Sequence, residues 1–519
     1  MTVLEKVGII DIGSNTIRLV IFEIDENYQY REIQNIKTPA RLFQYLDADK
    51  VLSPEGIQNL SDILSSFSVV LKEYKVETVI PVATAAIRQS TNQKEIVKTI
   101  KKNTGIKLQV FSEEEEAFYG QYAVAHTISY VDGITVDIGG GSTEITYFKN
   151  KKIENYISLP FGVGTLKQLF LQDTEFNNKN ALEKMDAFIK KELNKISWIK
   201  NKELPIIAIG GSARNIGYVH QRLTNYPIAG IHGYRMKKAD LKLTLDTFKS
   251  SSMKQLQELD GLSRDRWDII IPANLVFLNL FSVVNAPIFL FSNQGLRQGI
   301  LLNHINKTYN NPYSLQHIDQ ESVMQMANTY FIRKSVSQQR QKLTLNLLDQ
   351  LTKLDLFFLD DHYRKFIGYG AYLYYLGAYV EVDASSQHTF YIISNSNLNG
   401  ISHRDRVVLA LLASYKNKSL FKQYTANLPG WFTDVELDKI LAACGLIKFC
   451  EALNDSKLDT VESLQLEKIA SNKQTEKNGY RLTVFHKGDI IAEDYRSQRQ
   501  KKHLEKVVGS KVDIVFEAK

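Results

Sequence analysis

The alternation of apolar and polar positions predicts the same local structure at two places in the chain. Residues 7–22 and 133–148 each contain a short apolar run, an aspartate, a turn of small residues and a second apolar run. Two apolar runs on either side of such a turn are typical of a β-hairpin. Since the copies lie about 126 residues apart, they predict two structural repeats that each begin with a hairpin.

The positions after the first hairpin continue as an α/β pattern. Residues 31–36 predict a third strand, and a helix is expected to start at Ser53, with Pro54 in its first position. The apolar side chains of this helix recur with a 3.6-residue period. They are Ile57, Leu60, Ile63, Leu64 and Phe67. Further strands are expected at 78–83 and 106–111, and further helices at 92–103 and after Ser112.

The second hairpin is followed by a similar pattern, which runs from Gly133 to about Asn303. It includes a helix around residues 179–197 and a strand at 205–209. A hairpin followed by strand–helix units, given twice, predicts an α/β fold of two duplicated lobes with a cleft between them.

The pattern changes beyond residue 310. Residues 319–425 are mostly helical in pattern, and a break follows at 428–430. The last part predicts a helix, a hairpin, a basic helix and a final strand, with its strands at 480–485, 489–493 and 511–516. The expected domains are two lobes at 1–123 and 124–308, a helical domain at 309–430 and a small α+β domain at 431–519.

Composition narrows the setting of the protein. The 519-residue chain carries a net charge of +7, which suits a polyanionic substrate but does not require a nucleic-acid partner. Its two cysteines, Cys444 and Cys450, indicate a reducing compartment, and no Cys/His spacing matches a zinc site. No uncharged apolar run reaches about 18 residues, and the charged N-terminal strand does not resemble a signal peptide. We therefore expect a cytoplasmic protein without membrane segments.

Both hairpin tips have the composition of an anion-binding loop. Small residues let backbone N–H groups approach and hold a phosphate. The candidate phosphate ligands are Gly13, Ser14, Asn15, Thr16 and Arg18 in the first copy and Gly139, Gly140, Gly141, Ser142 and Thr143 in the second. Two ordinary hairpins with glycine turns are the alternative, and the match between the copies favours phosphate binding.

Several carboxylates lie close to these turns in the sequence. Asp11 and Asp137 end their strands just before the glycines, where they could hold a divalent cation directly or through water. Glu144 is either an exposed strand residue or a further ligand of metal or water. Four glutamates, residues 113–116, open a predicted helix, where the helix dipole stabilises each by about 0.3–1 kcal/mol. One of them could also deprotonate a water molecule, and spacing alone does not choose among the four.

Four arginines, Arg18, Arg88, Arg214 and Arg297, follow strand ends or small-residue turns. The fork of a guanidinium group suits phosphate oxygens, although any one of them could form an ordinary ion pair. The turn that precedes Arg214 adds Gly211 and Ser212 as candidate phosphate ligands.

The chain resembles the exopolyphosphatase/guanosine pentaphosphate phosphohydrolase (Ppx/GppA) family, part of the actin-like, sugar kinase and Hsp70 ATPase superfamily. The motifs that carry the resemblance are DIGSNTIR at 11–18, ATAAIR at 83–88, FS at 111–112 with EEA at 115–117, VDIGGGSTE at 136–144, SLPFG at 158–162, GGSA at 210–213 and GLRQG at 295–299. The resemblance covers essentially the whole chain and implies actin-like (ribonuclease H-like) lobes.

The resemblance also implies an activity and roles for residues. The implied activity is an exopolyphosphatase that releases orthophosphate from inorganic polyphosphate, with Mg²⁺ as cofactor, Mn²⁺ as an alternative divalent ion and K⁺ as a monovalent one. Glu116 maps to the catalytic base, with Glu115 and Arg88 as supporting residues. The metal ligands map to Asp137 and Glu144, joined by Asp11. The family pattern further implies a homodimer.

The helical domain resembles a metal-binding HD domain that has lost its ligands. Tyr374 and Tyr375 stand where a His and an acidic residue are expected, and His388 remains alone. We therefore expect a helical, catalytically inactive module that packs, dimerises or binds substrate. Basic residues that could form a track for polyphosphate are Arg235, Lys237, Lys238, Arg264, Arg266 and the run from Arg496 to Lys506.

Three other functions stay open at this point. The nearest is hydrolysis of guanosine pentaphosphate (pppGpp), with pppGpp or ppGpp as ligand at the same site. A kinase or ATP-driven machine with the same hairpins is a second, and it lacks an obvious adenine-pocket signature. A non-catalytic sensor of polyphosphate or alarmones is the third, and the retained Glu116, Asp137 and Glu144 argue against it.

Overall fold

The computed structural model describes residues 3–469 and 479–519. Two compact units can be distinguished. The first comprises Met1–Tyr226 and Ile231–Ile318, and the second comprises Pro227–Gly230 and Asp319–Lys519. Both predicted lobes lie in the first unit, and the helical and α+β parts lie in the second.

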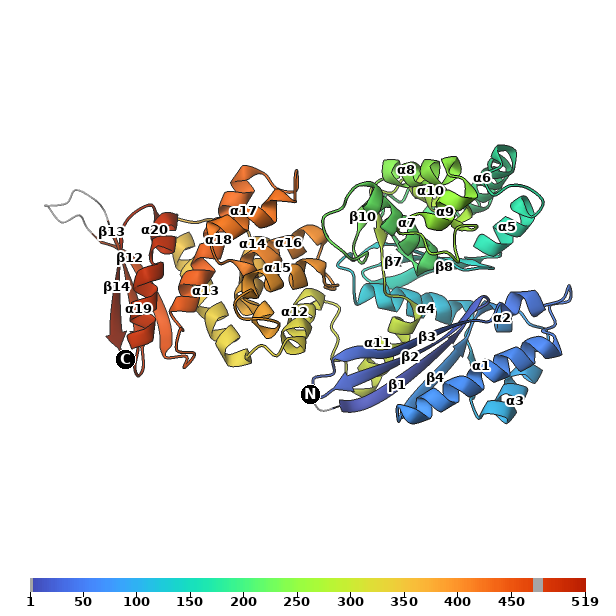
Figure 1. Cartoon of the computed structure of the whole chain (residues 1–519), viewed down its shortest axis with the longest axis horizontal. Coiled ribbons are helices and arrows are strands. Elements are labelled where there is room, and N and C mark those ends of the chain that lie inside the picture. The colour runs from blue at the N-terminus through green and yellow to red at the C-terminus, as the bar shows by residue number, and fades with distance from the viewer. Residues whose placement is uncertain (1–2, 470–478) are drawn as a thin grey trace. The chain divides into compact units, whose positions relative to one another are not determined.

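The first lobe is built on a five-stranded sheet with the order β3-β2-β1-β4-β5 (Figure 1). Its first three strands form an antiparallel meander, and β4 and β5 run parallel to β1. The elements are β1 (Val3–Ile12), β2 (Thr16–Asp25), β3 (Tyr30–Pro39), α1 (Pro54–Glu73), β4 (Thr78–Ala83), α2 (Ala85–Arg88), α3 (Gln93–Thr104), β5 (Gln109–Val110) and α4 (Glu113–Ala125). Ser53 caps α1 and Ser112 caps α4, as predicted.

The second lobe repeats this plan with one additional edge strand. Its sheet has the order β10-β11-β9-β6-β7-β8, again with an antiparallel meander and parallel strands beside it. The elements are β6 (Gly133–Ile138), β7 (Thr143–Lys149), β8 (Lys152–Leu159), α5 (Val163–Leu171), α6 (Lys179–Leu193), β9 (Ile206–Ile209), α7 (Gly210–Leu223), β10 (Arg235–Met236), α8 (Lys238–Ser250), α9 (Met253–Glu258), α10 (Ile270–Val284), β11 (Phe289–Phe291) and α11 (Leu296–Thr308). The predicted duplication of an α/β fold is confirmed.

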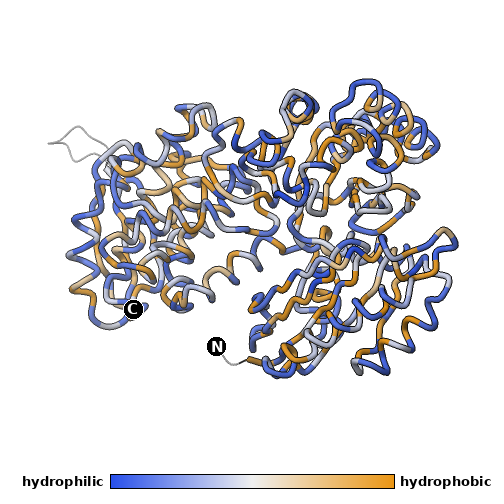
Figure 2. Tube along the Cα trace, turned by 45° about the vertical axis from the view of Figure 1, so that its right-hand side comes forward, coloured by the Kyte–Doolittle hydropathy of each residue, from blue (hydrophilic) through white to orange (hydrophobic). Residues whose placement is uncertain are grey.

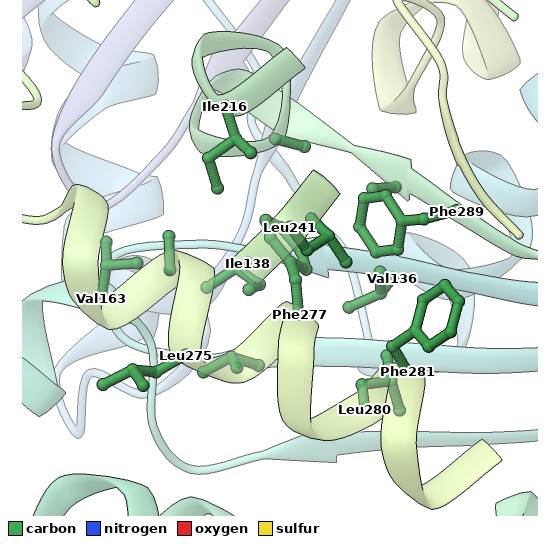
Figure 3. Close-up of a cluster of buried hydrophobic side chains, with 14 of the residues drawn as sticks. Val136, Ile138, Val163, Ile216, Leu241, Leu275, Phe277, Leu280, Phe281 and Phe289 are labelled. Atoms are coloured by element: carbon green, nitrogen blue, oxygen red, sulfur yellow. The ribbon is translucent and has the colours of Figure 1, made fainter. Parts of the chain in front are cut away.

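The central strands β6 and β9 of the second lobe are apolar on both faces, because side chains pack on both sides of them. Val136 and Ile138 of β6 pack with Leu241 and Phe277 in the largest core of this lobe (Figure 3). The alternate residues of β9, Ile207 and Ile209, face the opposite side, where the end of α4 packs. The alternation follows from the two-residue period of a strand.

Helices α4 and α11 join the two lobes. Apolar residues of α11 pack on the first sheet, although the sequence of α11 follows that of the second lobe. Helix α4 in turn contacts β6, β7 and β8 of the second lobe. The two helices pack against each other so closely that a Cβ atom on Gly299 would lie 1.9 Å from the carbonyl oxygen of Tyr119.

The second unit contains the predicted helical region and a small sheet with the order β12-β13-β14. Its elements are α12 (Ile318–Thr329), α13 (Lys334–Lys353), α14 (Asp361–Tyr372), α15 (Ser385–Asn395), α16 (His403–Ser414), α17 (Lys418–Ala426), α18 (Asp434–Ala452), β12 (Val461–Ile469), β13 (Gly479–His486), α19 (Ile491–Gln500), α20 (Lys502–Val508) and β14 (Val512–Ala518). Hydrophobic positions recur along the chain of both units (Figure 2). No helix in the described ranges is long and apolar enough to cross a membrane.

One expected hairpin is wrong. Residues 489–493 do not form a strand, because Ile491 starts the amphipathic helix α19. The antiparallel partner of β13 is instead β12, which precedes it in the chain. The buried Leu464 and Leu466 are two residues apart, as a strand requires, whereas the register shifts between Val461 and Ser463.

Aromatic packing occupies the position that resembles an HD metal site. The rings of Tyr374 and Tyr375 stack with their centroids 4.3 Å apart, and both hydroxyls donate to the carbonyl oxygen of Tyr415. Within residues 3–469 and 479–519, no group of three or more His, Cys, Asp or Glu side chains is placed to bind a metal ion. The inactivity of this domain stays a prediction.

Candidate active site

The two hairpin tips have the same backbone geometry. The N–H of Gly13 donates to the carbonyl of Thr16 over 3.1 Å, and the N–H of Gly139 donates to the carbonyl of Ser142 over 2.9 Å. In the strand register, Arg18 lies opposite Asp11, while Glu144 lies opposite Asp137. The duplicated hairpins therefore place a cation in one lobe at the position where the other has an acid.

Carbonyl groups in both tips accept hydrogen bonds from neighbouring backbone N–H groups. In the first tip, the carbonyl of Ser14 accepts from Phe43, and that of Asn15 accepts from Ala40 and Arg41. In the second, N–H groups at the start of α5 bind the carbonyls of Gly139 and Gly140.

The N–H groups of these tips remain available. Those of Ser14, Asn15, Gly140 and Gly141 donate to no acceptor within the described ranges. A backbone whose carbonyls are occupied and whose N–H groups are free can hold an anion. The geometry thus fits the predicted phosphate loops.

We expect Gly162→Ala to disturb the second loop. Its Cβ would lie 2.3 Å from the carbonyl oxygen of Gly139 and 2.7 Å from the carbonyl carbon of Gly140. Forcing an atom into such a contact costs about 1–3 kcal/mol, so the loop should move and the KM for a phosphorylated substrate should rise. Gly140→Ala is the control for folding, because its Cβ would meet no atom within 4 Å. An unchanged KM and melting temperature in Gly162→Ala would contradict the expectation.

Four of the predicted carboxylates line one cavity of about 140 Å³. They are Asp11, Glu116, Asp137 and Glu144. Thr84, Thr135 and Thr146 also line it, and none of the three was among the predicted site residues. Thr84 directly follows β4, and the strand period could have indicated the other two, because Thr135 is two residues from Asp137 and Thr146 is two residues from Glu144.

The structure distinguishes Glu116 from the three glutamates before it. Glu113, Glu114 and Glu115 are exposed, whereas Glu116 is half-buried and faces the cavity. Glu115 forms a capping box, because its carboxylate accepts from the N–H of Ser112 over 2.8 Å. Glu115 therefore caps the helix and does not line the cavity. Its supporting role, expected from the resemblance, stays a prediction.

Arg88 orients the carboxylate of Glu116. Its Nη1 atom donates to Glu116 Oε2 over 2.7 Å and to the carbonyl of Phe111 over 3.2 Å. Burial raises the pKa of Glu116, Arg88 opposes this, and the charges of Asp137 and Asp11 add to it. A carboxylate with a raised pKa beside a cavity is a candidate general base.

Burial and mutual repulsion raise the pKa values of two other acids in the cavity, Glu144 and Asp137. Burial, reinforced by the charges of Glu116 and Asp137, raises the pKa of Glu144 to about 8. Burial also raises the pKa of Asp137, while Arg214 opposes the shift. Since bound cations favour the charged form of a carboxylate, a divalent cation beside these oxygens would relieve the repulsion.

Arginines surround the same carboxylates. Arg297 Nη1 lies 3.0 Å from Asp11 Oδ2. Burial lowers the pKa of Arg18 and Arg214, and the charge of Arg297 lowers both further. Arg266 joins this group, since its charge acts on Asp137. The arginines thus carry positive charge that an anion would offset.

The predicted Gly211 and Ser212 lie against Arg266, and the preceding Gly210 lies against Asp137. A Cβ on Gly211 would lie 2.4 Å from Arg266 Nη2, and Arg266 Nη1 donates to Ser212 Oγ over 3.2 Å. Gly210 has a φ of +91°, and a Cβ there would lie 2.5 Å from Asp137 Oδ1. Close packing around the charged groups therefore accounts for the glycines of this turn.

The other basic residues proposed to form a track for polyphosphate are divided between the two units. Arg235, Lys237, Lys238 and Arg264 are exposed in the first unit, and the run from Arg496 to Lys506 lies in the second. Their role stays a prediction.

Comparison with known proteins identifies the family. Residues 20–308 match the model of the Ppx/GppA phosphatase family, and residues 318–497 match the model of Ppx/GppA phosphatase, domain III. A guanosine-5'-triphosphate,3'-diphosphate pyrophosphatase of Pseudoalteromonas translucida is 26% identical over 439 residues, which cover 81% of this chain and 82% of that protein.

Two further proteins match somewhat more than half of the chain. A bifunctional 3-dehydroquinate synthase/phosphatase of Fusobacterium nucleatum is 28% identical over 305 residues, and the match spans 56% of this chain and 46% of that protein. The crystal structure of the Aquifex aeolicus Ppx/GppA family member is 27% identical, with a TM-score of 0.53, and covers 59% of this chain and 99% of that one. With the duplicated fold and both family models in agreement, the chain belongs to the Ppx/GppA phosphatase family, a family of hydrolases.

Proposed function

We propose that this protein is an exopolyphosphatase that hydrolyses the terminal phosphoanhydride bond of inorganic polyphosphate and releases orthophosphate. The observation that carries the proposal is the cavity lined by Glu116, together with two hairpin tips with backbone N–H groups that donate to no acceptor in the described ranges. Acids, threonines and aliphatic residues line this cavity, and a substrate would present only its terminal phosphate to it. A chain of phosphates needs only the loops and the arginines.

Glu116 is the proposed base of this reaction. Arg88 occupies its Oε2 atom, and within the described ranges no hydrogen bond involves Oε1. That oxygen can therefore orient a water molecule and accept its proton as the water attacks the terminal phosphorus. The loops and the arginines would hold the phosphate oxygens, because phosphoryl transfer depends mainly on positioning and on offsetting charge.

The cavity also fits a divalent cation. Asp137 and Glu144 supply carboxylate oxygens, the ligands that Mg²⁺ and Mn²⁺ prefer, and Asp11 lies in the same cavity beside Arg297. Asp137 and Glu144 would be the protein ligands, because Mg²⁺ usually completes its coordination with water and substrate oxygens. When bound, Mg²⁺ would offset negative charge on the phosphates.

Replacing Asp137 with asparagine should raise the Mg²⁺ concentration needed for half-maximal phosphate release by at least about tenfold, because the cation loses a charged ligand. A magnesium titration of phosphate release checks this. Asp246→Asn, on α8, is a control of equal charge change away from the cavity. An unchanged magnesium requirement in Asp137→Asn would remove this residue from the metal site.

The second candidate substrate is pppGpp. It is favoured by the Pseudoalteromonas relative, which matches most of this chain and is named for action on guanosine-5'-triphosphate,3'-diphosphate. Both substrates end in a row of phosphates, so the same loops and Glu116 would serve.

Orthophosphate release from long-chain polyphosphate and from pppGpp, at equal concentrations of terminal phosphate, tests the proposal. A higher kcat/KM for polyphosphate would support it. A higher value for pppGpp would assign the second function, and no release from either would overturn both.

A further inference from the structure

One ion pair, formed by Lys37 and Asp265, connects the two lobes of the first unit. Lys37 lies on β3 of the first lobe, and Asp265 lies between α9 and α10 of the second. Lys37 Nζ is 2.8 Å from Asp265 Oδ2. Both side chains are partly exposed, at 38% and 50%, so the pair can open without a large cost of desolvation.

Each partner neighbours a residue of the candidate site. Lys37 is the cross-strand partner of Arg18, and Asp265 directly precedes Arg266, which contacts Ser212. Other contacts hold residues 263–268, which surround Asp265, to the second lobe. The N–H of Ser263 donates to Asn215 Oδ1, and Lys167 Nζ lies 2.6 Å from Asp268 Oδ2.

Asp265 is suited to act as a charged partner at neutral pH. Burial alone would raise its pKa, but the hydrogen bond and charge of Lys37, with the charge of Arg266, hold the pKa below its ordinary value. The negative charge of Asp265 therefore attracts cations on both sides, one from each lobe.

We propose that Lys37 and Asp265 form a clasp that holds the two lobes at the spacing seen in this structure and positions Arg266 beside the turn at Gly211 and Ser212. They are positioning residues, because they act through lobe closure and through Arg266. The effect on turnover rests on the proposed function, while the effect on lobe distance does not.

Steady-state kinetics with long-chain polyphosphate give the first test. An exposed ion pair contributes little, so Lys37→Gln and Asp265→Asn should each raise KM by about two- to fivefold, with a smaller change in kcat. The charge swap Lys37→Asp with Asp265→Lys should restore the KM, because it rebuilds the pair. Lys190→Gln is the matched control, since it breaks the exposed pair of Lys190 with Asp186 within α6.

The signs of the two single effects separate a clasp from a direct action on substrate. If Lys37 and Asp265 acted only as charges on a polyanion, Lys37→Gln would raise KM and Asp265→Asn would lower it. Opposite signs, or a charge swap that fails to restore the KM, would overturn the clasp.

Distance measurement between the lobes gives a test that needs no turnover. Spin labels on Val69→Cys and Leu169→Cys would report the distance between α1 and α5, where both positions are exposed. The native Cys444 and Cys450 are buried and should not be labelled. Both single variants should broaden the distance distribution, and Lys190→Gln should not. An unchanged distribution in both would overturn the clasp, even if phosphate release proved the proposed function right.

Discussion

Replacing Glu116 with glutamine should lower the rate of orthophosphate release by about 100- to 10,000-fold, the usual contribution of a general base. Glutamine has nearly the same shape, so the change removes the ability to accept a proton while little else moves. Arg88 can still donate to the amide oxygen of the new side chain. We therefore expect kcat to fall while the affinity for polyphosphate, measured by equilibrium binding, stays within about threefold, or about 0.6 kcal/mol.

Glu114→Gln is the matched control for this prediction. Glu114 lies in the same first turn of α4 and carries the same charge, but it is exposed and lies outside the cavity. Its replacement should change kcat by less than about twofold, because a dipole contribution of about 0.3–1 kcal/mol acts on helix stability and not on the reaction. Full activity of Glu116→Gln, or equal losses in both variants, would refute the assignment of Glu116.

Replacing Gly299 with alanine should destabilise the first unit and reduce its activity. The new Cβ would lie 1.9 Å from the carbonyl oxygen of Tyr119 and 2.7 Å from its carbonyl carbon. These are backbone atoms of α4, which cannot rotate away, so α4 and α11 must separate. Overpacking of this kind typically costs about 1–3 kcal/mol. The movement would also displace Glu116 on α4 relative to Leu296 on α11, which lines the same cavity.

Urea unfolding and phosphate release together check this prediction. Gly368→Ala, in helix α14 of the second unit, is a control, because its Cβ would meet side chains only at 3.4–3.5 Å. That substitution should leave stability unchanged or raise it slightly, since alanine favours a helix by about 0.8–1.0 kcal/mol over glycine. A Gly299→Ala variant as stable and active as the parent would show that the helix crossing tolerates separation.

The repeated hairpin was enough to predict the duplicated fold, because its pattern is local. The Asp–small-residue–apolar order determines the strands, the turn and the position of each aspartate at a strand end. The helix caps at Ser53 and Ser112 were likewise predictable, since a cap depends on a few neighbouring residues. The hairpin expected at 489–493 failed because its apolar positions also fit a helix, and strand pairing with β12 is a tertiary contact.

The site was predictable residue by residue but not as an arrangement. Spacing did not separate Glu116 from Glu113, Glu114 and Glu115, since all four suit a helix N-terminus. Of the four, only Glu116 lines the cavity, because tertiary packing decides which face of α4 lies against the second lobe. The sequence suggested a phosphate ligand at Arg88, and the structure places its Nη1 atom against Glu116.

Local sequence was sufficient to predict two hairpin-led α/β lobes with a turn of small residues at each tip, because strands, turns and caps follow from neighbouring residues. Which charges meet depends on tertiary packing. Asp11 pairs with Arg297 across 286 positions of the chain, and Lys37 pairs with Asp265 across 228. Such partners are brought together by the packing of α4, α11 and the two sheets, and no local pattern records that packing.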